Sequence, residues 1–272
     1  MSDVVVRELS TVAECAAITP LTWQVWGPNA PVFSVDLLRA IGHTGGYLAG
    51  AFLDAGAGGQ EAGAGEQEMV GFSLGLLADL NGARSLHSHA IGVLAHARGL
   101  HVGLALKEHQ RAWAHSRQIL TVTWTFDPLV RRNATFNLLR LGARAAEYLE
   151  DFYGLLDDDL NGPDPSDRLF LVWDVEHPAP PVGEAVLAGA GRLLADVDGA
   201  PVARGSDADV VLVATPADIE ALRSQDAGRA SAWRVAQREA LAAAMKAGRV
   251  VGFTRDGDYV VELGRTADRR RA

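Results

Sequence analysis

The stretch SLHSHAIGVLAHARGLHVGLALKEH, residues 85–109, constrains the fold more than any other part of this chain. Residues 85–94 have the composition of a strand, and the segment after Gly99 has the apolar spacing of a helix. A strand that turns through a glycine into a helix brings free backbone N–H groups and the positive end of the helix dipole to one point. Such a point suits a phosphate-sized anion, but by itself the pattern is also typical of a plain connection. The apolar positions of the expected helix are Val102, Leu106, His109 and Trp113.

Further strands and helices surround this segment. The expected order over residues 3–175 is strand, helix, helix, three strands, helix, strand, helix and two strands. Thr11 and Glu14 have the spacing of a capping box, and Gly142 is a natural helix stop. A Gly/Ala/Glu-rich insert at 54–68 is expected to be a loop. The expected strands are 4–9, 47–53, 69–77, 85–94, 119–126, 144–150 and 168–175. Helices are expected from Thr11, around 35–41, from the turn after Gly99 to about 115, and over 131–141.

A Pro-rich break, HPAPPVG at 177–183, predicts a domain boundary. We expect one domain over 1–177 and a small α/β domain over 178–272. In the second domain VVLVA is a strand, Asp218 starts a helical region that Gly248 ends, and Asp256-Gly257 turns a hairpin. The charged tail after residue 264 is expected to be solvated.

The charge and cysteine content exclude several classes of protein. A net charge of −9 and a pI near 5.3 argue against non-specific binding to nucleic acid or to an anionic membrane, because both need a basic face. Cys15 is the single cysteine, which excludes an intramolecular disulfide and a thiolate zinc site. Neither a signal pattern nor a membrane-length apolar run is found, so a cytoplasmic location is expected.

The turn at residues 98–103 and the order of elements resemble those of the GNAT superfamily of N-acetyltransferases. The superfamily motif is Arg or Gln, two residues, Gly, one residue, then Gly or Ala, and Arg98-Gly99-Leu100-His101-Val102-Gly103 fits it except that His101 replaces the central glycine. The resemblance covers about residues 3–175, and TWTFDPL with FNLLRLGA is similar to an uncharacterised bacterial subgroup of predicted acetyltransferases. It implies a GNAT-like α/β (α+β) fold, with a mixed, mostly antiparallel sheet flanked by helices. The C-terminal domain resembles the first half of such a unit.

The resemblance also implies a set of residues that bind acetyl-CoA as co-substrate, without a metal. The backbone of the strand before the motif would pair with the pantetheine arm, and the loop would hold the pyrophosphate. A histidine at a position that needs a positive φ costs on the order of 1 kcal/mol. Leu138 falls where many members carry the tyrosine that protonates the leaving thiolate, so that general acid is missing. The cofactor residues are Ile91, Val93 and Leu94 on the strand, Arg98, Gly99, His101, Val102, Gly103 and Leu104 in the loop and helix, and Asn133 further along.

Three residues are candidates for catalysis. His87 and His89 share one face of a strand, so either is a candidate base, while two polar residues on a solvent-facing strand are the alternative. Asp127 follows the TWTF strand, where loops carry function, but Asp-Pro is also a common turn starter. Arg131 and Arg132 are candidates for the adenosine 3′-phosphate or are plain exposed arginines.

We therefore expect an enzyme that transfers an acetyl group from acetyl-CoA to a small amine or amino-acid-like acceptor by direct attack. The alternative is a GNAT fold that has lost catalysis and serves as a CoA-binding or protein-interaction module. No nucleic acid or membrane partner is expected, and a homodimer is left open.

Overall fold

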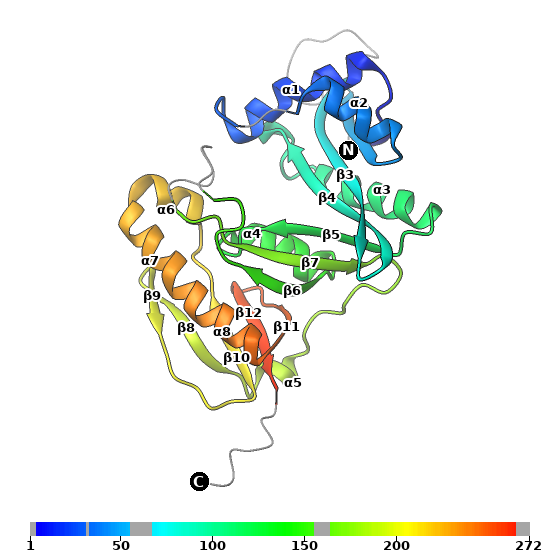
Figure 1. The fold of residues 1–272 in the computed structure, drawn as a ribbon. Coiled ribbons are helices and arrows are strands. Elements are labelled where there is room, and N and C mark those ends of the chain that lie inside the picture. Colours follow the sequence, from blue (N-terminus) through cyan, green and yellow to red (C-terminus); the bar gives the residue numbers. More distant parts are fainter. Residues whose placement is uncertain (1–3, 31–32, 55–66, 155–163, 265–272) are drawn as a thin grey trace. The chain divides into compact units, whose positions relative to one another are not determined.

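The computed structural model describes residues 4–30, 33–54, 67–154 and 164–264 (Figure 1). Most of the expected loop insert, at 55–66, and the charged tail, at 265–272, lie outside the described residues. The described chain forms two compact units. Unit 1 comprises its residues up to Trp124 together with Asp174–Glu176, and unit 2 comprises the remainder.

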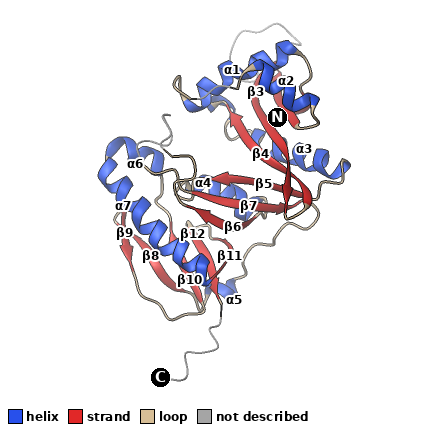
Figure 2. Ribbon diagram, in the orientation of Figure 1, coloured by secondary structure: helices blue, strands red, loops and turns tan. Residues whose placement is uncertain are grey.

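Unit 1 contains a sheet in which β1, β2, β3 and β4 pair antiparallel in sequence order. The first part of β5 pairs with β4 in parallel. Figure 2 shows α1 and α2 next to each other, with α3 apart from them. The elements are β1 (Val5–Glu8), α1 (Val12–Trp26), α2 (Val35–His43), β2 (Tyr47–Asp54), β3 (Gln67–Leu80), β4 (Ala83–Val93), the short 3-10 helix η1 (Ala95–Ala97), α3 (Val102–Ser116) and β5 (Thr121–Phe126).

Two apolar clusters form the core of unit 1. In the first, residues of α1 and α2 such as Ile18 and Leu38 pack with Phe72 of β3. In the second, Val102 and Leu106 of α3 pack with residues of β2 and β3. The α1–α2 pair and α3 therefore cover opposite faces of the sheet, because successive side chains of a strand point to opposite faces.

The predicted start of α1 is confirmed. The Thr11 side chain accepts a hydrogen bond from the Glu14 N–H at 3.2 Å, and the Glu14 carboxylate accepts the Thr11 N–H at 2.9 Å. These two bonds satisfy N–H groups that have no acceptor within the helix. The pKa of Glu14 is lowered to about 2, because its carboxylate accepts the N–H groups of Ser10 and Thr11 and pairs with the guanidinium of Arg7.

Unit 2 contains an antiparallel pair, β6 and β7, and a five-stranded sheet in the order β11-β12-β10-β8-β9. Within this sheet β8 and β10 are parallel and the other pairs are antiparallel. The long helical segment that begins with α7 runs along the strands (Figure 1). The elements are α4 (Arg131–Ala134), the π-helix η2 (Thr135–Arg140), β6 (Arg144–Leu149), β7 (Arg168–Asp174), α5 (Glu184–Leu187), β8 (Gly191–Val197), β9 (Ala200–Ala203), β10 (Val210–Ala214), α6 (Ile219–Gln225), α7 (Ala227–Gln237), the π-helix η3 (Arg238–Ala242), α8 (Ala243–Ala247), β11 (Gly248–Phe253) and β12 (Asp258–Leu263).

The mixed α/β class with mostly antiparallel sheets is confirmed, and so is the order of elements up to β7. Gly142, with φ of 68°, follows the helical segment as predicted. The hairpin of β8 and β9 was not predicted, although its turn residues Asp198 and Gly199 both have positive φ, at 51° and 78°.

The expected boundary at residue 177 does not coincide with the division into compact units, which falls within β5. The reason lies inside unit 2, where the segment after residue 177 packs with the residues just after β5. The Tyr259 hydroxyl donates to the Pro128 carbonyl at 2.8 Å, and β11 packs against η2 and β6.

Candidate active site and cofactor loop

The loop between β4 and α3, residues 94–101, has a backbone geometry that suits anion binding at the start of α3. We call it the anion loop. Its chain turns twice through the left-handed region, at Gly99 with φ of 86° and at His101 with φ of 61° and ψ of 16°. His101 therefore adopts the positive φ that we considered from the sequence as one possibility for this position. Histidine is among the few side chains that are enriched at such φ values.

Backbone donors of α3 remain free at this loop. The first helical hydrogen bond runs from the Ala105 N–H to the His101 carbonyl at 2.9 Å. The N–H groups of Val102, Gly103 and Leu104 consequently have no acceptor within the helix. The first turn of α3 carries no acidic residue, and a Cβ added at Gly103 would meet no atom within 4 Å outside its chain neighbours and the backbone of its own helix. The loop thus offers donors, a positive dipole end and open space, which suit an anion.

The strand that leads into the loop has an edge that β5 leaves unpaired. The pairs between β4 and β5 in the described chain are Leu86 with Val122 and His87 with Thr123. The register of β4 against β3 shifts at His89, which makes His89 the extra residue of a bulge. Beyond the bulge, Ile91 and Val93 pack towards the α3 cluster. Leu94 belongs to the opposite cluster. The predicted pantetheine residues therefore line the part of β4 that pairs only with β3.

The two predicted histidines lie together at this bulge. Their ring centroids are 6.1 Å apart, and the His87 Nδ1 is 3.2 Å from the Thr123 hydroxyl. Partial burial lowers the pKa of both imidazoles, and the charge of Lys107 contributes at His87. Both rings are therefore neutral at pH 7 and can accept a proton.

Aromatic side chains cover β4 on the side of α1 and α2. Phe33 lies edge-on to His89 at 5.9 Å between centroids, and Phe72 lies edge-on to Trp26 at the same distance. Gly92 permits this close packing, because an added Cβ would lie 2.9 Å from Phe72 and 3.1 Å from Trp26. The wall next to His89 is thus apolar and aromatic.

Lys107 of α3 is a buried cation that the sequence prediction missed. Its side chain points to the sheet, where the ammonium donates to the Ser88 hydroxyl at 2.9 Å and to the side-chain amide oxygen (Oε1) of Gln110 at 3.0 Å. It lies 3.8 Å from the centroid of the Trp124 ring. Burial lowers the pKa of Lys107 from 10.5 to about 7. The signal in the sequence was its place beside the apolar stripe of the helix, next to Leu106.

Asp127, the third predicted catalytic residue, lies in unit 2 and is buried. Its Oδ2 accepts from Arg223 and from Arg234, each at 2.7 Å, and its Oδ1 accepts from the Leu129 N–H at 2.9 Å. Burial alone raises the pKa of Asp127, but the guanidinium groups of Arg234 and Arg223 bring it to about 2. A carboxylate held in this way favours a structural role over that of a base.

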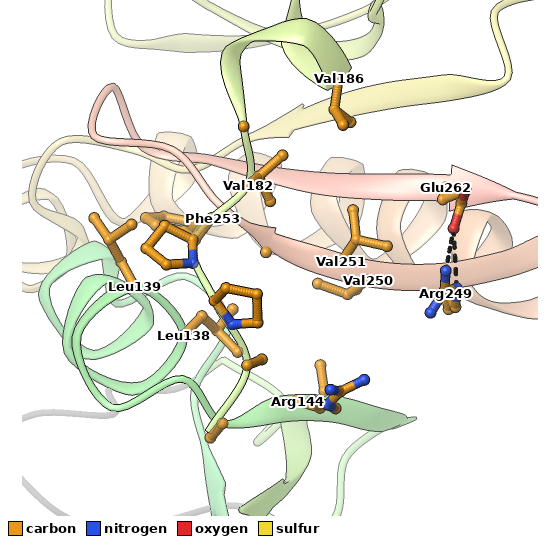
Figure 3. Close-up of a pocket in the computed structure, with 17 residues that line it drawn as sticks. Leu138, Leu139, Arg144, Val182, Val186, Arg249, Val250, Val251, Phe253 and Glu262 are labelled. Carbon is orange, nitrogen blue, oxygen red and sulfur yellow. Dashed lines mark hydrogen bonds and ion pairs between the residues drawn. The ribbon is translucent and has the colours of Figure 1, made fainter. Parts of the chain in front are cut away.

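The other residues singled out between 130 and 140 also lie in unit 2. Arg131 donates to the Thr215 hydroxyl at 3.0 Å, and Arg132 pairs with Glu220 at 2.7 Å. Asn133 is half-buried in α4. Leu138 of η2 is buried and helps to line a hollow of about 410 Å³, together with valines and Phe253 of the C-terminal segment (Figure 3).

Comparison with known proteins gives similarity at the level of solved structures only. No family model and no curated protein matches this chain. The chain is similar to the ribosomal-protein-S18-alanine N-acetyltransferase from Escherichia coli, with 15% identity, a TM-score of 0.45 and coverage of 67% of this chain and 97% of that chain. It is also similar to a subunit of the NatC complex bound to Gag peptide and CoA, with 14% identity, a TM-score of 0.47 and coverage of 63% and 98%. A putative acetyltransferase from Salmonella typhimurium with its cofactor acetyl-CoA matches with 15% identity, a TM-score of 0.44 and coverage of 66% and 99%.

Two further findings concern the described residues as a set. They contain no group of three or more His, Cys, Asp or Glu side chains placed to hold a metal ion. None of their helices combines the length and apolar character needed to span a bilayer.

Proposed function

We propose that this protein transfers an acetyl group from acetyl-CoA to the nitrogen of a small amine or amino-acid-like acceptor. The observation that carries the proposal is the anion loop at the end of a strand with an unpaired edge. The loop supplies free N–H groups at the start of α3, and β4 supplies backbone groups beyond the pairs that it forms with β5. A ligand with a diphosphate at one end and an amide-containing arm at the other uses both features.

The proposed path of the ligand follows β4. The pyrophosphate binds at the N–H groups of Val102, Gly103 and Leu104, with Arg98 exposed beside them. From Val93 back to Ser88 the strand advances five residue steps, roughly 17 Å at the usual strand rise, which an extended pantetheine arm spans. The thioester then lies near the last pairs of β4 with β5.

The proposed chemistry is direct attack by the acceptor amine. The amine approaches from the aromatic side of β4, beside Phe33, and its lone pair attacks the thioester carbonyl carbon. His89 is neutral at pH 7 because of its lowered pKa, so it can accept the proton that the amine loses, directly or through water. His87 lies behind it as the second candidate base. We do not extend the proposal to Asp127, because its carboxylate already binds two arginines.

Substitution of Gly103 by aspartate tests the proposal. The new carboxylate fits in open space and suits the first turn of a helix, so folding stability should be preserved. The same carboxylate occupies the proposed diphosphate site with like charge, and we expect acetyl-CoA affinity to fall roughly 100-fold or more in calorimetry. Gly103→Ala is the matched control and should bind within a few fold of the wild type. Equal binding by Gly103→Asp and Gly103→Ala would mean that the diphosphate does not bind at this helix start. Tight binding without acetylation of any amine tested would support the alternative of a CoA-binding module.

A further inference from the structure

Lys107 is a buried ammonium with polar but uncharged hydrogen-bond partners. It is 2% exposed, and its two hydrogen-bond acceptors are Ser88 of β4 and Gln110 of α3. The face of the Trp124 ring also lies next to the ammonium, at 3.8 Å from Nζ to the ring centroid, and favours the charged form. Among the described residues no carboxylate forms an ion pair with it. A structural lysine in a core normally has such a partner, because an unpaired buried charge is costly.

The titratable group that the structure places near this ammonium is His87 of β4, whose pKa the charge of Lys107 helps to lower. Its other neighbours, Ser88, Gln110 and Trp124, do not titrate near neutral pH. Burial brings the pKa of Lys107 itself to about 7, so a large part of the population carries a positive charge at neutral pH.

The position of Lys107 in unit 1 is close to the place where β4 and β5 stop pairing. Ser88 directly follows His87, which forms the last pair with β5, and Trp124 directly follows Thr123, the partner of His87. The ammonium therefore lies next to Ser88 and Trp124, the residues that directly follow the last pair between β4 and β5. The unpaired edge of β4 begins at the same place. This is also the end of the proposed pantetheine path, where the sulfur of CoA would lie.

We propose that the ammonium of Lys107 supplies the positive charge that stabilises the CoA thiolate as it leaves, an inference that rests on the proposed function. Lys107 acts through its charge, with Ser88 between the ammonium and the ligand. We therefore call it a positioning residue and not a catalytic residue. By its charge it would stabilise the thiolate that a general acid would otherwise protonate.

Acetyl transfer from the thioester to the amine needs no further reactant. The amine nitrogen forms a bond to the carbonyl carbon, and the carbon–sulfur bond breaks with its electron pair on sulfur. The proton of the amine goes to His89 or to water. The charge of the Lys107 ammonium behind Ser88 stabilises the thiolate until CoA dissociates and takes a proton from solvent. In a low-dielectric site such a charge interaction is stronger than in water.

The ionisation of bound CoA tests this inference without an acceptor substrate. The ultraviolet absorbance of the thiolate would be followed against pH for CoA bound to the full chain, to Lys107→Met and to Lys246→Met as the control. Methionine keeps the length of the side chain and removes its charge. We expect at least about a tenfold larger thiolate fraction in the wild type and in Lys246→Met than in Lys107→Met, equivalent to one pKa unit.

A second measurement needs no variant. Lys107 and Lys246 are the two lysines of the chain, so lysine labelled with carbon-13 at Cε gives two resolvable side-chain signals. We expect CoA to raise the pKa of Lys107, because a nearby thiolate favours the ammonium, and we expect desulfo-CoA not to raise it. The signal of Lys246 should not respond to either ligand.

The outcomes separate this inference from the proposed function. If CoA binds but its thiol ionises equally in the wild type and in Lys107→Met, or if CoA and desulfo-CoA shift Lys107 alike, the inference is wrong and the proposed function stands. If CoA does not bind to the wild type, the proposed function is wrong and the inference falls with it.

Discussion

At the scale of single residues, Lys107 sets an unusual pH dependence of stability. Its pKa is about 7 in the folded protein and 10.5 as the reference value for an unfolded chain. Between these pH values the unfolded chain holds a proton that the folded chain lacks, so this group makes the protein more stable as pH rises. Below pH 7 both states are protonated, and the folded state carries the full cost of a buried ammonium.

Substitution of Lys107 by methionine should remove that pH dependence. The free energy of unfolding of Lys107→Met minus that of the wild type should be larger at pH 6 than at pH 10, by on the order of 4 kcal/mol. The variant therefore gains most stability over the wild type at low pH. Urea unfolding of both proteins at the two pH values measures the difference, with Lys246→Met as an exposed control. A difference that does not change with pH would mean that Lys107 titrates as an ordinary lysine.

At the scale of elements, the start of α3 is decided by His101. The residue adopts a left-handed conformation that favours glycine, and its imidazole is exposed. His101→Gly should leave acetyl-CoA affinity unchanged or higher, because the donors of the anion loop are backbone groups and glycine relieves a strain of about 1 kcal/mol. Calorimetry of the two proteins side by side gives the answer. A loss of affinity of tenfold or more would show that the imidazole itself contacts the ligand.

The sequence predicted the elements whose signals are local. The capping box at Thr11, the glycine stop at residue 142 and the Asp256-Gly257 hairpin depend on neighbouring residues, and the structure contains all three. The β8–β9 hairpin carried the same kind of Asp-Gly signal and was overlooked. The partners of Lys107 and Asp127 could not be predicted, because Ser88, Trp124, Arg223 and Arg234 come from other elements and only the fold brings them close.

At the scale of the whole molecule, the C-terminal segment depends on residues before it. Within unit 2, Arg234 is 2% exposed and pairs with Asp127, and Arg238 pairs with Asp167 at 2.8 Å. Removing one partner of such a buried pair costs about 3–5 kcal/mol, because the remaining charge stays buried and unpaired. The segment after the Pro-rich stretch is therefore not expected to fold by itself.

Two fragments test this expectation. Residues 182–272 expressed alone should melt without a cooperative transition or aggregate, because Arg223, Arg234 and Arg238 lose their acidic partners. Residues 119–272 retain Asp127 and Asp167 and should show more stable structure by circular dichroism and thermal melting. A cooperative, monomeric melt of residues 182–272 would contradict this expectation and support the predicted domain boundary near residue 177.

The central claim is that the anion loop and the unpaired edge of β4 together bind acetyl-CoA. Isothermal titration calorimetry of the full chain with acetyl-CoA tests it most directly. We expect saturable binding at one site per chain, with an affinity that Gly103→Asp lowers roughly 100-fold or more and that Gly103→Ala retains. Absence of binding to the wild type at millimolar acetyl-CoA would contradict it.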